Sequence, residues 1–446
     1  MDIAASPPQA DRRPGRIVDP DFPLDPVPPA YRQGRWQVAI VVAGFLFFTP
    51  TMVTAGQVAA PLGFGSFVLA AAAATAFLAV YITTLGWLST RSGLSTVLLA
   101  RATLGRLGGK WACLLLGGTQ VVWYAITIGI LGNLVAAAFG WSITWPVVVV
   151  GGIVMAVTAY YGFKGIEILS WISVPLMTVL CVWVLARAVG EAGGWPGLAG
   201  TGPSGEPVSM GAAISMMIGT FISGGTQMGN WTRFGRTAAG TAGLVAGAVV
   251  VVQFAMLFFG GVGAISYGIA DFAELLLAMG LVAVALVLLV ANLWTTNDNT
   301  AYAFGVAGAE LFERNDKRPF VVGGVVLGIV LAISGIADSI LDYLVVVGVM
   351  IPPLGGVMIG LYFTSVARLD PARAVADAPQ IRLPGLLAYL LGVAAALAGA
   401  LTDTGSPAIQ GLVVALVAAL VVGRLFPDVA AESSHTEQAG VDRWQP

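Results

Sequence analysis

The chain has 446 residues, of which 57% are hydrophobic and 10% charged, and its formal net charge is −2. Because soluble globular proteins carry about 25% charged residues, this chain lacks the charge to cover a water-facing surface of its size, which excludes a soluble enzyme. The near balance between 21 basic and 23 acidic residues also argues against a nucleic-acid-binding protein, so a polytopic membrane protein remains.

Twelve segments are apolar enough, and close enough to the required length of about 20 residues, to form membrane-spanning helices. Polar or Gly/Pro-rich breaks separate them. The first 30 residues, rich in Pro, Asp and Arg, precede any apolar run, so we do not expect a cleavable signal peptide there. We expect residues 1–36 and 425–446 to be cytoplasmic tails. The predicted spans are residues 37–57, 66–89, 111–139, 146–162, 166–189, 210–231, 240–267, 276–303, 320–337, 342–364, 385–401 and 408–424.

The basic residues predict how these spans are oriented. When the segments between spans are assigned to alternate sides, 20 of the 21 Lys and Arg residues fall on one side and only Arg187 falls on the other. Cytoplasmic loops of membrane proteins carry the excess of Lys and Arg. The distribution therefore predicts an even number of spans, with both termini in the cytoplasm.

Two spans contain residues that interrupt a helix near its middle. In the first span, Pro50 lacks an amide donor and opposes a straight helix. In the sixth span, residues 218–227 include three glycines and four hydroxyl or amide side chains. Matching interruptions in two five-span halves are typical of inverted-repeat secondary transporters, which bind their ligands at mid-membrane. The alternative is that Gly and Pro serve only close helix packing.

The third span carries two side chains suited to a planar ligand. Gln120 and Trp123 lie at positions i and i+3, on one helix face. Trp offers a stacking surface, and Gln offers both a donor and an acceptor to the edge of a heterocycle. Phe221, in the sixth span, is the candidate aromatic partner on the opposite wall.

One face of the eighth span is polar, because Asn292, Thr295, Thr296 and Asn299 recur at helical spacing. The two threonine hydroxyls, with carbonyls from an unwound helix, would suit a sodium ion. Alternatively, these side chains only hydrogen-bond neighbouring helices to one another.

Asp298 also lies in the eighth span, where a charged residue needs a partner. We expect it to pair with Arg233 or Arg236, or to cap the lower half of the helix near water. Two cysteines, Cys113 and Cys181, lie far apart in apolar runs, and the single histidine, His435, lies in the C-terminal tail. Disulfide frameworks, His-rich metal sites and His-based catalysis are therefore excluded.

Several of these strings, in their order along the chain, resemble the bacterial cytosine permeases of the nucleobase:cation symporter family. The resemblance extends from about residue 35 to about residue 425. The strings are Gly117-Gly118-Thr119-Gln120-Val121-Val122-Trp123, Gly219-Thr220-Phe221-Ile222-Ser223, Arg233-Phe234-Gly235-Arg236, Asn292-Leu293-Trp294-Thr295-Thr296-Asn297-Asp298-Asn299 and Ile351-Pro352-Pro353-Leu354-Gly355-Gly356.

The resemblance implies an all-α protein of the bacterial inner membrane with twelve transmembrane helices and a leucine-transporter-like fold. Residues 37–364 would form a ten-helix core, a five-plus-five inverted repeat with discontinuous first and sixth helices, and residues 385–424 would form two extra helices. The protein would couple nucleobase import to sodium, with no enzymatic activity, no nucleic acid and no obligate protein partner.

The resemblance also implies individual ligands. A base would lie between Trp123 and Phe221, and sodium would bind carbonyls in the first span and hydroxyls in the eighth. Asn292 would link the two sites. The implied base contacts are Gln120, Asn292, Ser223 and the Gly219 and Thr220 backbone, and the implied sodium ligands are the carbonyls of Gly44 and Phe48 and the hydroxyls of Thr295 and Thr296.

The chain departs from the family pattern at three places. Thr220 stands where a serine is expected, Pro50 stands where a small non-proline residue is expected, and Gly224 replaces an alanine. Hydroxymethylpyrimidine, purines, allantoin and hydantoins therefore stay open as substrates, and protons stay open as the coupling ion. A channel would need a ring of carbonyls or charges, which the sequence does not indicate. A membrane enzyme would need a nucleophile or a metal cluster, and the sequence indicates none.

Overall fold

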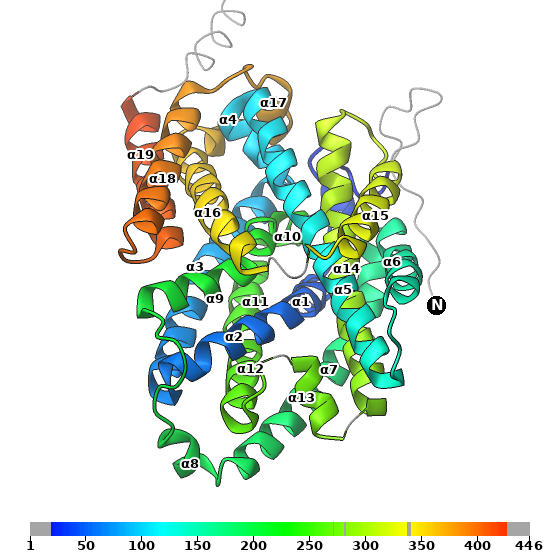
Figure 1. Cartoon of the computed structure of the whole chain (residues 1–446). Helices are drawn as coiled ribbons and strands as arrows, with labels where there is room; N and C mark the ends of the chain where they lie inside the picture. Colours follow the sequence, from blue (N-terminus) through cyan, green and yellow to red (C-terminus); the bar gives the residue numbers. More distant parts are fainter. Residues whose placement is uncertain (1–18, 271, 281, 337–339, 426–446) are drawn as a thin grey trace, which may run out of the picture.

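The structure is a computed structural model that describes residues 19–425 except 271, 281 and 337–339 (Figure 1). The described part is almost entirely helical, with an isolated β-bridge between Gln33 and Gly235. Most of the two predicted tails, including His435, lies outside the described residues.

Long helices or consecutive shorter ones coincide with the predicted spans. Three short helices connect them, α8 (Trp195–Ala199), α13 (Phe272–Ala278) and α17 (Pro371–Ala376), and single-turn helices occur at Pro29–Tyr31 and Val366–Arg368. The others are α1 (Arg35–Leu46), α2 (Thr49–Leu62), α3 (Phe64–Ser92), α4 (Thr96–Ala112), the π-turn η2 (Cys113–Gly117), α5 (Gly118–Phe139), α6 (Trp145–Tyr160), α7 (Phe163–Glu191), α9 (Met210–Thr226), α10 (Gly229–Thr232), α11 (Ala238–Ala248), the π-turn η3 (Val249–Gln253), α12 (Phe254–Tyr267), α14 (Val282–Leu311), α15 (Arg318–Ile333), α16 (Ile340–Thr364), α18 (Leu383–Leu401) and α19 (Pro407–Leu425).

Seven helical segments of the described chain are long and apolar enough to cross a membrane, and the bent pair α1 and α2 would make an eighth. Helices α6 and α15 are apolar but shorter, with 16 residues each. The chain is therefore a multi-pass membrane protein.

The interruption predicted in the first span is confirmed. Helix α1 ends at Leu46, helix α2 begins at Thr49, and the two are bent by 46°. Pro50 lies in the first turn of α2. A proline is well accommodated there, because the first amides of a helix have no intrahelical acceptor.

The interruption predicted within residues 218–227 of the sixth span comes at the end of that stretch, not at its glycines. Helix α9 continues to Thr226, and the break follows at Gln227 and Met228. The glycines allow close packing instead. A Cβ on Gly224 would lie 2.8 Å from the ring of Phe45, and one on Gly225 would lie 2.7 Å from the Ile82 side chain.

Two predicted boundaries also differ. Helix α4 begins at Thr96, where the Ser95 hydroxyl caps it, but Gly105, at φ +86°, interrupts it, so the segment that continues into α5 begins after Gly105 rather than at residue 111. Arg101, whose charge suggested a loop, is paired with Glu310 at 2.9 Å. The eighth span begins at residue 282 rather than 276, because Gly280, at φ +75°, separates α13 from α14.

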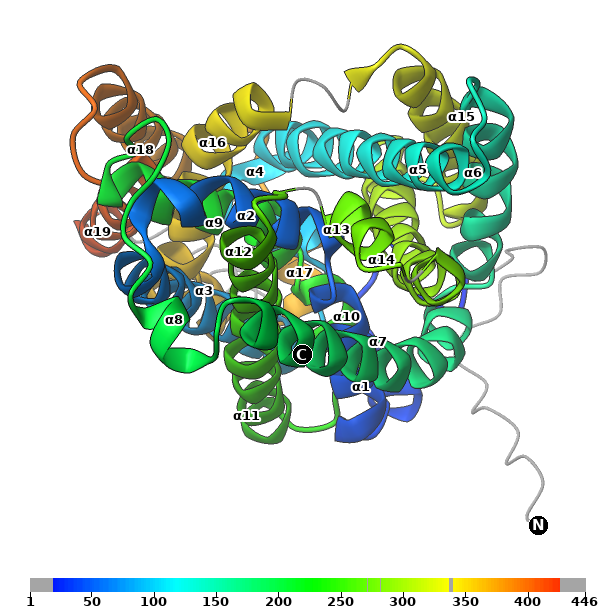
Figure 2. The same cartoon turned by 60° about the horizontal axis from the view of Figure 1, so that its bottom comes forward.

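The helices around the middle of the molecule form two groups. Helices α1–α3 and α9–α12 pack mainly against one another and are called the first helix group. Helices α4–α6, α14 and α15 are called the second helix group; α5, α6, α14 and α15 lie on the right of Figure 2, whereas α4 lies farther left and also packs against α16, α17 and α18. Helix α7 contacts α1, α12 and α14, while α16, α18 and α19 pack together at the opposite edge.

Close approach between α2 and α12 depends on Gly260, where a Cβ would overlap the backbone of Met52. We expect Gly260→Val to lower the melting temperature of the detergent-solubilised protein, with a cost of about 1–3 kcal/mol. The matched control is Gly247→Val in α11, where an added Cβ meets nothing within 4 Å. Equal melting temperatures for the two variants would contradict this packing.

Candidate functional site

A small cavity lies between the two helix groups, at the level of the break between α1 and α2. Its volume is about 10 Å³, room for one water-sized sphere. Aromatic side chains provide much of its wall. The residues that line it are Phe45, Phe48, Gln120, Trp123, Thr220, Phe221, Ser223, Gly224 and Thr300.

The two aromatic rings predicted to hold a base do face this cavity, and a third ring lies against both. The ring centroid of Phe48 is 4.9 Å from that of Trp123 and 6.0 Å from that of Phe221, edge-on in each case. Phe48 comes from the broken segment between α1 and α2. Its side chain therefore fills the space between Trp123 and Phe221.

Trp123 is held in place from two sides. Its indole Nε1 donates to the Ser223 hydroxyl at 2.9 Å, and its ring meets Tyr343 edge-on at 5.3 Å. The Ser223 hydroxyl, predicted to contact a base, thus accepts a hydrogen bond that joins α5 to α9. This bond fixes the plane of the tryptophan.

Gln120 has an amide that is ready to bind a ligand. Its side chain is buried and lines the cavity, yet neither its oxygen nor its nitrogen has a hydrogen-bond partner among the described residues. Leaving such a group unpaired costs about 1–3 kcal/mol. A polar ligand in the cavity would recover that cost.

The sixth span offers fewer free backbone groups to a ligand than the sequence suggested. Because α9 is helical at Gly219 and Thr220, their peptide groups lie within a helix. The Thr220 hydroxyl lines the cavity, donates to the Met217 carbonyl at 2.8 Å and accepts from Thr51 at 3.3 Å. Gly219 is buried but does not line the cavity.

The polar face of α14 meets the break in the first span. The Asn292 side chain accepts a hydrogen bond from the Thr49 hydroxyl and donates one to the Phe47 carbonyl. The Thr296 hydroxyl donates to that same carbonyl at 3.3 Å. The Thr295 hydroxyl donates within its own helix, to the Asn292 carbonyl at 2.8 Å.

Carbonyl groups at the break have lost regular helical partners. The Phe48 amide, which would donate to Gly44 in a continuous helix, donates to the Leu46 carbonyl at 2.8 Å instead. The Phe48 carbonyl accepts from the Thr51 amide at 2.9 Å. Carbonyl and hydroxyl oxygens thus gather where α1, α2 and α14 meet, a donor set that fits an alkali cation.

The expected pairing of Asp298 is wrong. Asp298 is fully buried, and its carboxylate accepts from the Asn299 amide at 3.0 Å. Arg233 donates to the carbonyls of Asp21 and Phe22, and Arg236 donates to that of Arg32. Burial in the middle of α14 also excludes a capping role near water.

Sequence reasoning missed four residues of this site. Phe45, Gly224 and Thr300 line the cavity, and the Phe47 carbonyl receives the bonds from α14. Two spacings were available as signals, because Phe45 lies three residues before Phe48 and Thr300 lies four residues after Thr296 on the polar face of the eighth span. Such spacing is also ordinary for residues that pack in a helical core.

A family model described as "Permease for cytosine/purines, uracil, thiamine, allantoin" matches residues 26–423 of the chain. Among curated proteins, the cytosine permeases of Escherichia coli O157:H7 and of Escherichia coli strain K12 are both similar to it. Each is 34% identical over 378 residues, which cover 84% of this chain and 89% of that protein.

Solved structures share the fold. One is Mhp1, described as a nucleobase-cation-symport-1 family transporter, in a closed conformation with bromovinylhydantoin bound. It matches with a TM-score of 0.76 and 17% identity, and the match covers 90% of this chain and 94% of that chain. Its inward-facing conformation matches with a TM-score of 0.76, 18% identity and coverage of 97% and 99%. A Na⁺-coupled sialic acid symporter matches with a TM-score of 0.68, 12% identity and coverage of 92% of both chains.

Proposed function

The chain belongs to the family of permeases for cytosine/purines, uracil, thiamine and allantoin, and we propose that it is a sodium-coupled symporter that imports cytosine across the bacterial inner membrane. The observation that carries the proposal is the buried amide of Gln120, which lies beside Trp123 and Phe221 and has no hydrogen-bond partner among the described residues. A planar base that hydrogen-bonds at its edge would satisfy the amide and stack on the rings.

The proposed base site uses residues from both helix groups. The base stacks between Trp123 and Phe221, and Gln120, Asn292 and Ser223 bind its edges. Gly219 and Thr220 would contribute backbone groups only if α9 loosens when the base binds. Phe48 must leave the slot to admit the base, because the cavity of about 10 Å³ is too small for a heterocycle.

The proposed sodium site lies at the break in the first span. Its ligands are the carbonyls of Gly44 and Phe48 and the hydroxyls of Thr295 and Thr296. Support comes from the bonds of Asn292 and Thr296 to the neighbouring Phe47 carbonyl, which place α14 against this break. A hard cation prefers such oxygen ligands, and half-helices offer them in many secondary transporters.

These contacts suggest how the two ligands assist each other. A cation near the Phe47 carbonyl repels the Asn292 amide hydrogens, which then turn toward the base. The same rearrangement moves the adjacent Phe48 ring out of the slot. Each ligand must then raise the affinity for the other by the same factor.

The proposed topology follows the sequence prediction. Twelve spans cross the membrane with both termini in the cytoplasm, and residues 37–364 form an inverted repeat whose discontinuous helices are α1–α2 and α9–α10. Alternating access is a movement of the first helix group relative to the second. Moving one net charge inward is assisted by about 2.3 kcal/mol per 100 mV of membrane potential.

Uptake of radiolabelled cytosine into proteoliposomes tests the proposal as a whole. We expect uptake that requires an inward sodium gradient and is blocked by unlabelled cytosine but not by adenine, uracil, hydroxymethylpyrimidine or allantoin. Transport of a different labelled heterocycle would change the substrate, and uptake driven by a pH gradient without sodium would change the coupling ion. Absence of transport for every heterocycle would contradict the proposed function.

Trp123→Ala removes one face of the proposed slot. Loss of aromatic stacking costs about 1–3 kcal/mol, so we expect cytosine to bind roughly 5- to 150-fold more weakly in a binding titration. Trp171→Ala is the matched control, because Trp171 is 51% exposed on α7, away from the cavity. Unchanged affinity in Trp123→Ala would exclude the stacking arrangement.

Thr296→Ala removes a proposed sodium ligand. We expect the sodium concentration that gives half-maximal uptake to rise about tenfold, while uptake at saturating sodium largely recovers. Thr178→Ala serves as control, because its exposed hydroxyl bonds only to the Val174 carbonyl of its own helix among the described residues. The same sodium dependence in both variants would rule out this cation assignment.

A further inference from the structure

Two carboxylates lie buried in the segment that precedes the first span. Residues 19–34 lead into α1, and the Asp19 and Asp21 residues are only 5% and 3% exposed. Burying a carboxylate is costly unless a cation and hydrogen bonds compensate it. The segment must therefore be held by specific partners.

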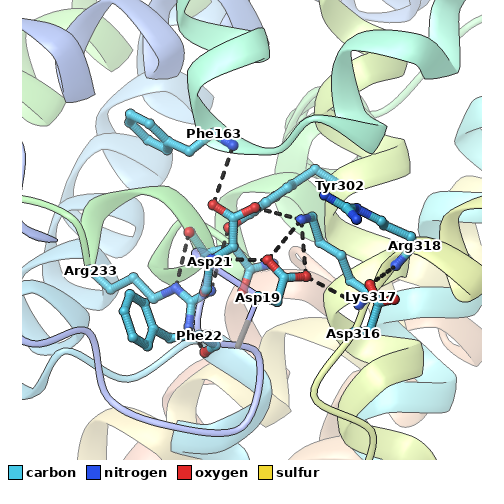
Figure 3. A network of polar contacts seen from close by, with 10 residues as sticks. Asp19, Asp21, Phe22, Phe163, Arg233, Tyr302, Asp316, Lys317 and Arg318 are labelled. Carbon is cyan, nitrogen blue, oxygen red and sulfur yellow. Dashed lines mark hydrogen bonds and ion pairs between the residues drawn. The ribbon is translucent and has the colours of Figure 1, made fainter. Parts of the chain in front are cut away.

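Lys317 is the cation that these carboxylates meet. Its Nζ lies 3.2 Å from both carboxylate oxygens of Asp19 and 2.6 Å from Oδ2 of Asp21, and its side chain is 2% exposed (Figure 3). Its backbone amide also donates to Asp19, at 3.2 Å. Lys317 directly precedes α15, so this contact ties the N-terminal segment to the second helix group.

Arg233 holds the same segment from the other side. Its guanidinium donates to the carbonyls of Asp21 at 2.6 Å and Phe22 at 2.9 Å (Figure 3). Arg233 directly follows α10, in the first helix group. Farther along the segment, Val27 bonds to the Gly93 carbonyl and Arg32 bonds to the Thr90 carbonyl, both at the end of α3.

The N-terminal segment is thus bonded repeatedly to the first helix group, with which it is continuous through α1. Lys317 attaches it to the second group. The base slot lies between these same two groups. In the proposed orientation this attachment is at the cytoplasmic end, where the groups must separate for a base to leave inward.

The energetics suit a contact that forms and breaks. Burial raises the pKa of the Asp21 carboxyl, although Lys317 beside it acts in the opposite direction. The cost of removing water from the carboxylate thus opposes the attraction within the pair. Buried ion pairs of this kind add little net stability but strongly favour the one conformation in which the partners meet.

We propose that Lys317, with Asp19 and Asp21, forms a latch that holds the cytoplasmic side of the transporter closed and must break before the base is released. The direction of release rests on the proposed function. Opening of the latch hydrates all three charged groups at once. The first helix group, with the N-terminal segment, then tilts away from α15.

Thiol labelling from the cytoplasmic side tests the latch. A reporter, Thr300→Cys, is introduced into the full-length chain with Cys113→Ser and Cys181→Ser. Thr300 lines the cavity, about one turn beyond Thr296 in the direction of Lys317. Inside-out membrane vesicles are treated with a membrane-impermeant maleimide, and the reporter reacts only when the cytoplasmic side opens.

We expect Lys317→Met to increase the labelling rate at least about tenfold, because it removes the attraction that favours closure. Arg101→Met is the matched control. It breaks another buried ion pair, Arg101 with Glu310 at 2.9 Å, but both partners belong to the second helix group. Labelling in that variant should stay at the rate of the reporter parent.

Two further variants keep the test decisive if Lys317→Met does not fold. Asp19→Asn with Asp21→Asn should also increase labelling, and the exchange Asp21→Lys with Lys317→Asp should return it toward the parent rate. Labelling at the parent rate in every folded latch variant would overturn the proposal. Failure of both neutralised variants to fold would also overturn it, since the cluster would then be a folding element.

Labelling requires no substrate, so it separates the two proposals. Fast labelling of Lys317→Met in a protein that transports no heterocycle would support the latch and reject the proposed substrate. Sodium-dependent cytosine transport, combined with labelling of Lys317→Met at the parent rate, would support the proposed function and reject the latch.

Discussion

The structure depends on an interruption of the backbone at membrane depth. Between Leu46 and Thr49 the chain leaves the helix, and its peptide groups cannot bond to water in a bilayer. Polar side chains of α14 supply hydrogen bonds in place of water, and Asn292 and Thr296 donate to the Phe47 carbonyl. This requirement explains why a strongly apolar chain places amides and hydroxyls in one of its longest helices.

The same interruption places an aromatic side chain where a ligand would bind. Phe48 follows Phe47 directly, and its ring lies against Trp123 and Phe221. A change in the backbone at Phe47 therefore moves the neighbouring Phe48 ring, and so changes the space available in the slot. The slot also lies between the two helix groups, so a bound ligand influences how the groups meet. The N-terminal segment, through Lys317, influences the same contact from outside the slot.

Some of this arrangement could be predicted from the sequence, because the physics involved is local. Apolar length located the helices, Pro50 located the break, and the spacing of Gln120 with Trp123 identified one wall of the cavity. The glycines of α9 were misleading, since close packing against Phe45 and Ile82 requires glycine as much as an unwound helix does. The cluster around Lys317 was not predictable, because its partners are about 300 residues away and only the fold brings them together.

The coupling of the two ligands through residues 47 and 48 is the central claim, and cytosine binding to the purified protein with and without sodium tests it most directly. The account predicts that saturating sodium tightens cytosine binding, and that saturating cytosine tightens sodium binding by the same factor. Equal cytosine affinity in the presence and absence of sodium, in a protein that binds cytosine, would contradict it.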